Sequence, residues 1–101
     1  ATDEGARKAE ELLRRNLALY EEGYDYAKPH ATMYNAVLDA IARTGEQSAG
    51  RRAEDLLHEM ENLWKAGHTE MKPSERSYNA VILAYRNEGD GGKRAEEILM
   101  R

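Results

Sequence analysis

Apolar residues recur at spacings of three and four along most of the chain, which is the periodicity of one face of a helix. The pattern predicts five helices, at about 3–22, 31–43, 51–65, 75–87 and 93–101. Segments that contain glycine separate these helices, at 23–30, 45–50, 67–73 and 89–92. No segment alternates apolar and polar residues for long enough to predict a strand. The expected fold class is therefore all-α.

The same pattern occurs more than once. The tetrapeptide Tyr-Asn-Ala-Val at 34–37 returns 44 residues later at 78–81, and Lys-Pro at 28–29 returns at 72–73. Periods of this length are typical of stacked supersecondary units, because an isolated helix hairpin cannot cover its own apolar face. We therefore expect an α-α superhelix, a solenoid of antiparallel helix hairpins with about five helices.

The repeat also suggests how the chain is organised. Residues 1–30 correspond to the second half of a unit, 31–74 to a complete unit and 75–101 to an incomplete one. The expectation is a piece of a longer array. In such arrays the function usually lies on a surface built from the same position of successive repeats.

Composition narrows the possible functions. The chain has no cysteine, which excludes disulfides and thiolate metal sites, and a net charge of −4, which does not favour phosphate binding. No apolar run approaches the roughly 18 residues of a membrane span, and no signal peptide is predicted. His58-Glu59 would begin a zinc-protease motif, but Asn62 replaces the second histidine. We expect no enzyme, no cofactor, no metal and no small-molecule substrate.

Three stretches together resemble the pentatricopeptide repeat. They are Thr-Met-Tyr-Asn-Ala-Val-Leu-Asp-Ala at 32–40, Arg-Ala-Glu-Asp-Leu-Leu-His-Glu-Met at 52–60 and Lys-Pro at 72–73. The stretch at 77–82 with 95–99 is similar to a second copy, and 9–13 is similar to the tail of a preceding one. The tetratricopeptide repeat fits less well, since it requires a Trp and a Leu-Gly pair in its first helix. The units here are longer than the family's, with the extra residues in the 44–50 turn and between 60 and 73.

The resemblance implies sequence-selective binding of single-stranded RNA, with one nucleotide per repeat read by two or three side chains. It also implies RNA processing or expression in a mitochondrion or chloroplast. The residues that would contact RNA by position are Asn35 with Ser74 on one base, Asn79 on the next, His30 on the preceding one, and Thr32 and Arg76 against base faces.

Two alternatives follow from the residues themselves. Each asparagine could instead bond to backbone or to a neighbouring repeat. The chain could also be a protein–protein interaction scaffold of tetratricopeptide-like type, whose groove receives a peptide or helix. The charge of −4 and the longer turns favour the scaffold.

Tyr34 and Tyr78 are predicted to be core residues between the two helices of a unit.

Overall fold

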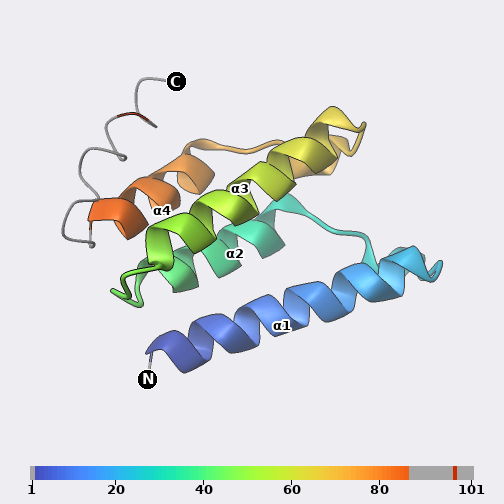
Figure 1. Ribbon diagram of the computed structural model, residues 1–101. Coiled ribbons are helices and arrows are strands. Elements are labelled where there is room, and N and C mark those ends of the chain that lie inside the picture. The colour runs from blue at the N-terminus through green and yellow to red at the C-terminus, as the bar shows by residue number, and fades with distance from the viewer. Residues whose placement is uncertain (1, 87–96, 98–101) are drawn as a thin grey trace.

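The computed structural model describes residues 2–86 and residue 97, and the regular elements of this part are helical (Figure 1). They are α1 (Thr2–Glu21), a 3₁₀ turn η1 (Asp25–Ala27), α2 (Ala31–Ala42), α3 (Ala49–Lys65), a 3₁₀ turn η2 (Thr69–Met71) and α4 (Glu75–Arg86). The predicted all-α class and the first four predicted helices are confirmed. The 89–92 turn and, residue 97 apart, the 93–101 helix lie outside the described residues.

The sequence repeat is also a repeat of structure. The elements α3 and η2 end 44 residues after α1 and η1, and η2 and α4 begin 44 residues after η1 and α2. Counted from α1, the described chain therefore contains two copies of one helix–turn–helix unit, α1–η1–α2 and α3–η2–α4, which begin half a repeat earlier than the units expected from the sequence. The 3₁₀ turns were not predicted; each places one buried residue, Ala27 or Met71, against the rest of the protein.

Both longer helices end in the same way. Gly23 and Gly67 adopt φ angles of 105° and 111°. In each case the glycine N–H donates to the carbonyl three residues earlier, and the next N–H donates to the carbonyl five residues before it. This is the Schellman arrangement, which satisfies the last carbonyls of a helix and favours glycine because it lacks a Cβ atom. The predicted helix end at Gly23 is confirmed to within a residue or two.

The start of α3 differs from the prediction. Gly50 was expected to lie in a turn, but it is the second residue of α3 and is buried. The reason is tertiary: Tyr85 of α4 lies so close that a Cβ atom at Gly50 would overlap its ring. Glycine here permits a close approach of two helices rather than a turn.

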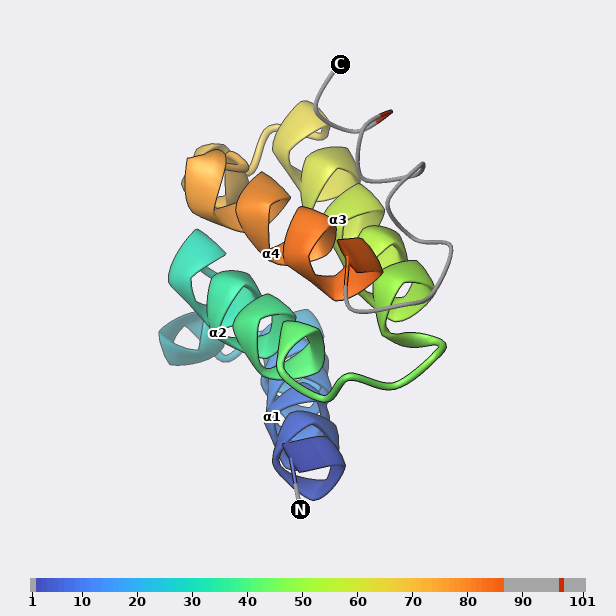
Figure 2. The same cartoon turned by 90° about the vertical axis from the view of Figure 1, so that its left-hand side faces the viewer.

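The helices lie in two layers, with α1 and α3 in one and α2 and α4 in the other (Figures 1 and 2). The central helix is α2, which contacts α1, α3 and α4. The core lies between the layers, and its largest fully buried apolar side chains are Tyr34, Leu38, Ile41, Leu57, Met60, Met71 and Val81. The layered arrangement sets α2 beside α4, and these helices carry most of the predicted RNA-contacting residues.

Candidate nucleic-acid interface

Asn35 lies on α2 and faces α4, and only 7% of its surface is exposed. Its Oδ1 accepts a hydrogen bond of 2.6 Å from the hydroxyl of Ser77, which is fully buried on α4. The Ser77 hydroxyl in turn accepts a bond of 3.1 Å from the backbone N–H of Ser74. The polar chain therefore links α2 and α4, the shorter helices of the two units. It also satisfies an N–H at the start of α4, as in one half of a capping box.

The other predicted residues are more accessible. Asn79, Thr32, His30 and Ser74 are all exposed. His30 and Ser74 directly precede α2 and α4, and the Ser74 carbonyl accepts the N–H of Tyr78 at 3.2 Å. The predicted start of the fourth helix at about residue 75 is thereby confirmed. The equivalent asparagines thus occupy different environments: Asn35 is enclosed between α2 and α4, and Asn79 is open.

Arg76 crosses from α4 to α2 and bonds Asp39. Its Nε and Nη2 donate to the same carboxylate oxygen, Oδ2, at 3.0 and 2.6 Å. The side chain of Arg76 is 66% exposed, so the pair contributes little to stability. Its consequence is orientation, because a guanidinium held along one edge keeps its planar faces available for stacking. Sequence reasoning missed this pair, since its members are 37 residues apart.

The two lysines of the repeated Lys-Pro pair are both engaged. Lys28 contacts Glu70 of η2 at 2.9 Å, and this contact raises the pKa of Lys28 and lowers the pKa of Glu70. Lys72 stands over the ring of Trp64, with Nζ 5.8 Å from its centre. The lysines therefore do not form a basic patch free of other contacts.

The other layer carries a network of ion pairs between α1 and α3. Arg14 contacts Glu59 at 2.6 Å, and Arg52 contacts Glu10 at 3.5 Å. These residues line a hollow of about 320 Å³. Such partly exposed pairs are screened by solvent. Their alternation of sign along α1 and α3 gives this face no strong attraction for an anionic polymer.

Tyr34 is fully buried, as predicted. Its hydroxyl has no hydrogen-bond partner of proper geometry among the described residues, and neither has Oε2 of Glu59. Burial, and then the nearby charge of Glu59, raise the pKa of Tyr34 above its ordinary value of 10.0. The equivalent Tyr78 is partly buried and donates to Glu61 at 3.2 Å.

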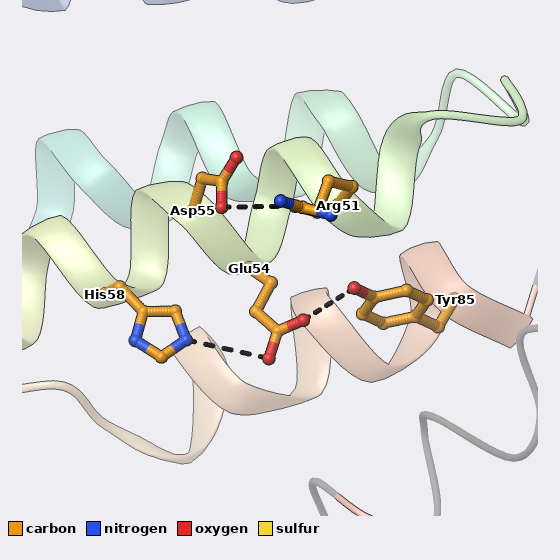
Figure 3. Close-up of a pocket in the computed structure, with 5 residues that line it drawn as sticks. All are labelled: Arg51, Glu54, Asp55, His58 and Tyr85. Carbon is orange, nitrogen blue, oxygen red and sulfur yellow. Dashed lines mark hydrogen bonds and ion pairs between the residues drawn. The ribbon is translucent and has the colours of Figure 1, made fainter.

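A second hollow of about 350 Å³ lies between α3 and α4 (Figure 3). Glu54 projects into it and is only 5% exposed. It accepts the Tyr85 hydroxyl at 2.6 Å, and His58 Nε2 lies 3.6 Å from its other oxygen. Sequence reasoning missed that this acid is buried. Its position three residues before the buried Leu57 was the available signal.

Within the described residues, no set of histidines and carboxylates is placed to hold a metal ion. The helices of that part are also too short or too polar to cross a membrane. Compared with known proteins, the chain matches no family model, no curated protein and no solved structure. The likeness to the pentatricopeptide repeat therefore rests on the sequence motifs alone. The class that the fold defines is an all-helical protein built from an internal repeat.

Proposed function

We propose that this chain is a helical-repeat module of the pentatricopeptide type that binds single-stranded RNA along the face formed by α2 and α4. The observation that supports this most is the recurrence of the whole helix–turn–helix unit at 44 residues. The recurrence sets equivalent positions of α2 and α4 beside one another. Further units of the same kind would extend the pair into an α-α superhelix in which the equivalents of α2 and α4 share one wall.

The exposed residues of this face supply the contacts. Arg76, oriented by Asp39, offers a flat cation for base stacking, and Thr32 occupies the equivalent place on α2. Asn79 offers an exposed amide to a base edge. Asn35 contributes less to RNA contact, because it is only 7% exposed and its Oδ1 already accepts a hydrogen bond. By resemblance alone, the protein acts in RNA processing or expression in a mitochondrion or chloroplast, without catalysis by this chain.

The test compares two arginines of matched exposure. Arg76→Gln and Arg15→Gln remove the same charge, and the two side chains are 66% and 68% exposed. Arg15 lies on α1, in the other layer. Binding of labelled single-stranded RNA is measured by fluorescence anisotropy at several salt concentrations. We expect Arg76→Gln to weaken binding several-fold more than Arg15→Gln, since a guanidinium over an aromatic ring contributes about 0.5–2 kcal/mol.

An equal loss for both variants would show that only net charge matters and would refute the assignment of this face. The proposal also requires that the unaltered chain binds RNA more tightly than an unrelated acidic polymer. Its affinity for RNA must fall as the salt concentration rises.

The second candidate is a protein–protein scaffold that receives a peptide along the same face. Two observations favour it: the enclosure of Asn35 and the net charge of −4. If the chain binds RNA no more tightly than it binds an acidic polymer, the protein–protein scaffold is the better explanation.

A further inference from the structure

We infer that α1 carries a docking surface for an acidic amphipathic helix of a partner protein. The surface is an outward-facing stripe, called the outer stripe, formed by Lys8, Leu12 and Arg15. These residues are exposed and lie at spacings of four and three, so they share one face of the helix. The stripe belongs to the layer that does not carry the proposed RNA face, and the inference does not depend on RNA binding.

The second unit shows what such a stripe contacts. The residues that correspond to the outer stripe, 44 positions later, are Arg52, Leu56 and Glu59 of α3. All three line the hollow between α1 and α3, together with Glu10 and Arg14. Arg52 contacts Glu10 at 3.5 Å, and Glu59 contacts Arg14 at 2.6 Å. This stripe of α3 therefore faces the long helix of the other unit.

The equivalent leucines of the two units differ in burial. Leu56 is 3% exposed, whereas Leu12 is 63% exposed. The difference arises because α3 packs against α2 of the other unit as well as against its own α4. Among the described elements, α1 makes no extended contact that corresponds to the one between α3 and α2. Figure 1 accordingly shows α1 at the outer edge of the molecule. A single exposed leucine is ordinary on a protein surface, and it is the equivalence of all three positions that marks this one.

The charges of the outer stripe specify the partner. Lys8 has the same sign as its equivalent Arg52, which contacts an acid of α1. Arg15 has the opposite sign to its equivalent Glu59, which contacts an arginine of α1. A helix seated on the outer stripe as α1 is seated on α3 therefore needs an acid at both places. Those two places are one helical turn apart on α1, so the fitting partner is a helix with two acidic side chains one turn apart.

Leu12 and the two cations have different parts in this docking. Burial of Leu12 supplies affinity, since removal of apolar surface from water is favourable. The cations supply selection among partners, because a like charge placed opposite either of them is repelled. Arg15 also lies 3.7 Å from Glu11 of its own helix, with the two side chains 68% and 69% exposed. Such an exposed pair is weak, so it does not hold Arg15 away from a partner.

The experiment uses two synthetic peptides as probes. Both have the sequence of α1, Thr2–Glu21, and one of them carries Arg14→Glu, which gives it two acids one turn apart. Each peptide is titrated into the nitrogen-15-labelled whole chain, and amide chemical shifts report both the affinity and the place of binding. The chain variants are Leu12→Ser and Arg15→Glu. Their side chains are exposed, so we expect both variants to fold, and circular dichroism checks this.

We expect the unaltered chain to bind the Arg14→Glu peptide about fivefold more tightly than the unaltered peptide, with shifts on α1. Arg15→Glu should reverse this order, because it restores the pairing of arginine with glutamate that joins α1 to α3. Arg43→Glu, which changes the net charge equally at an exposed arginine after α2, should keep the order. Leu12→Ser should weaken binding of both peptides several-fold, and Leu83→Ser, at an exposed leucine of α4, should not.

Three results would overturn the inference. They are an order of the peptides that Arg15→Glu leaves unchanged, chemical shifts that lie away from α1, and absence of binding by either peptide. Self-association of the chain that dilution and Leu12→Ser both abolish would make a second copy the occupant of the stripe. That result would equally overturn the assignment to a partner protein.

Discussion

Alanine at Gly50 should destabilise the protein, although Gly→Ala inside a helix ordinarily stabilises it. An ideal Cβ atom at Gly50 would stand 2.6 Å from Cε1 and 2.7 Å from Cγ of Tyr85, and closer still to Cδ1. Normal carbon–carbon contacts begin at about 3.5 Å. The ring cannot swing aside freely, because Tyr85 is 8% exposed and its hydroxyl is bonded to the buried Glu54 at 2.6 Å.

The size of the destabilisation follows from two opposing effects, the cost of overfilling the core and the gain in helix propensity. Overfilling a packed core costs about 1–3 kcal/mol, and displacement of the ring would also weaken a bond to a buried carboxylate. Replacing glycine in a helix gains at most about 1 kcal/mol, and less near a helix start. The expected net loss is about 1–2 kcal/mol of unfolding free energy. For a domain of this size that corresponds to a fall in Tm of roughly 4–16 °C.

The first unit already contains a pair of residues that combines alanine with a smaller partner on the facing helix. The positions that correspond to Gly50 and Tyr85 hold Ala6 and Ile41, and both are buried. The larger Tyr85 thus faces a glycine, whereas the smaller Ile41 faces an alanine. In a Tyr85→Ile background, Gly50→Ala should therefore cost nothing or stabilise slightly. The two substitutions should be strongly non-additive, as expected for residues in contact.

The assay is urea unfolding followed by circular dichroism for the two single variants, the double variant and Gly5→Ala. Gly5 lies in α1 with no atom within 4 Å of an ideal Cβ, so it reports the helix-propensity gain alone. The reasoning is refuted when Gly50→Ala stabilises the protein as much as Gly5→Ala. It is also refuted when the cost of Gly50→Ala is the same with Tyr or Ile at position 85.

Three further predictions use the same assay. Gly67→Ala should destabilise by about 1–2 kcal/mol, because φ is 111° while the space is open; a result as mild as Gly5→Ala would contradict the backbone argument. Tyr85→Phe should destabilise by about 1–3 kcal/mol by removing a donor from the buried Glu54, and a neutral effect would show that the bond contributes nothing. Tyr34 has a raised pKa, so from about pH 10 upward the unfolded chain loses a proton that the folded chain keeps, and stability falls by up to about 1.4 kcal/mol per pH unit. Tyr34→Phe should reduce this loss above about pH 10 while changing little near neutrality; an unchanged alkaline slope would argue against the shift.

Much of the fold could be predicted because its signals are local. The spacing of apolar residues predicted four of the helices, and Gly23 marked the end of the first. The 44-residue period predicted that the chain would contain equivalent units, and the structure repeats at that spacing. The helices and the glycine end depend on residues a few positions apart. The period is visible as soon as the sequence is aligned with itself.

The candidate site was less predictable. The motif indicated which positions to consider, but it did not show that Asn35 is enclosed and Asn79 exposed. That difference arises because α4 covers one side of α2, and Asn35 bonds a residue 42 positions away. The orientation of Arg76 likewise depends on a carboxylate from another unit.

The sequence by itself determined the helices, their glycine ends and the period of the units, because helix propensity and turn chemistry act within one or two turns. Only the tertiary structure decided which side of α2 is covered, why position 50 must be glycine and which atom of Asn35 is bonded to α4. These depend on how closely two helices approach and in which register, and that is set by side chains far apart in the chain.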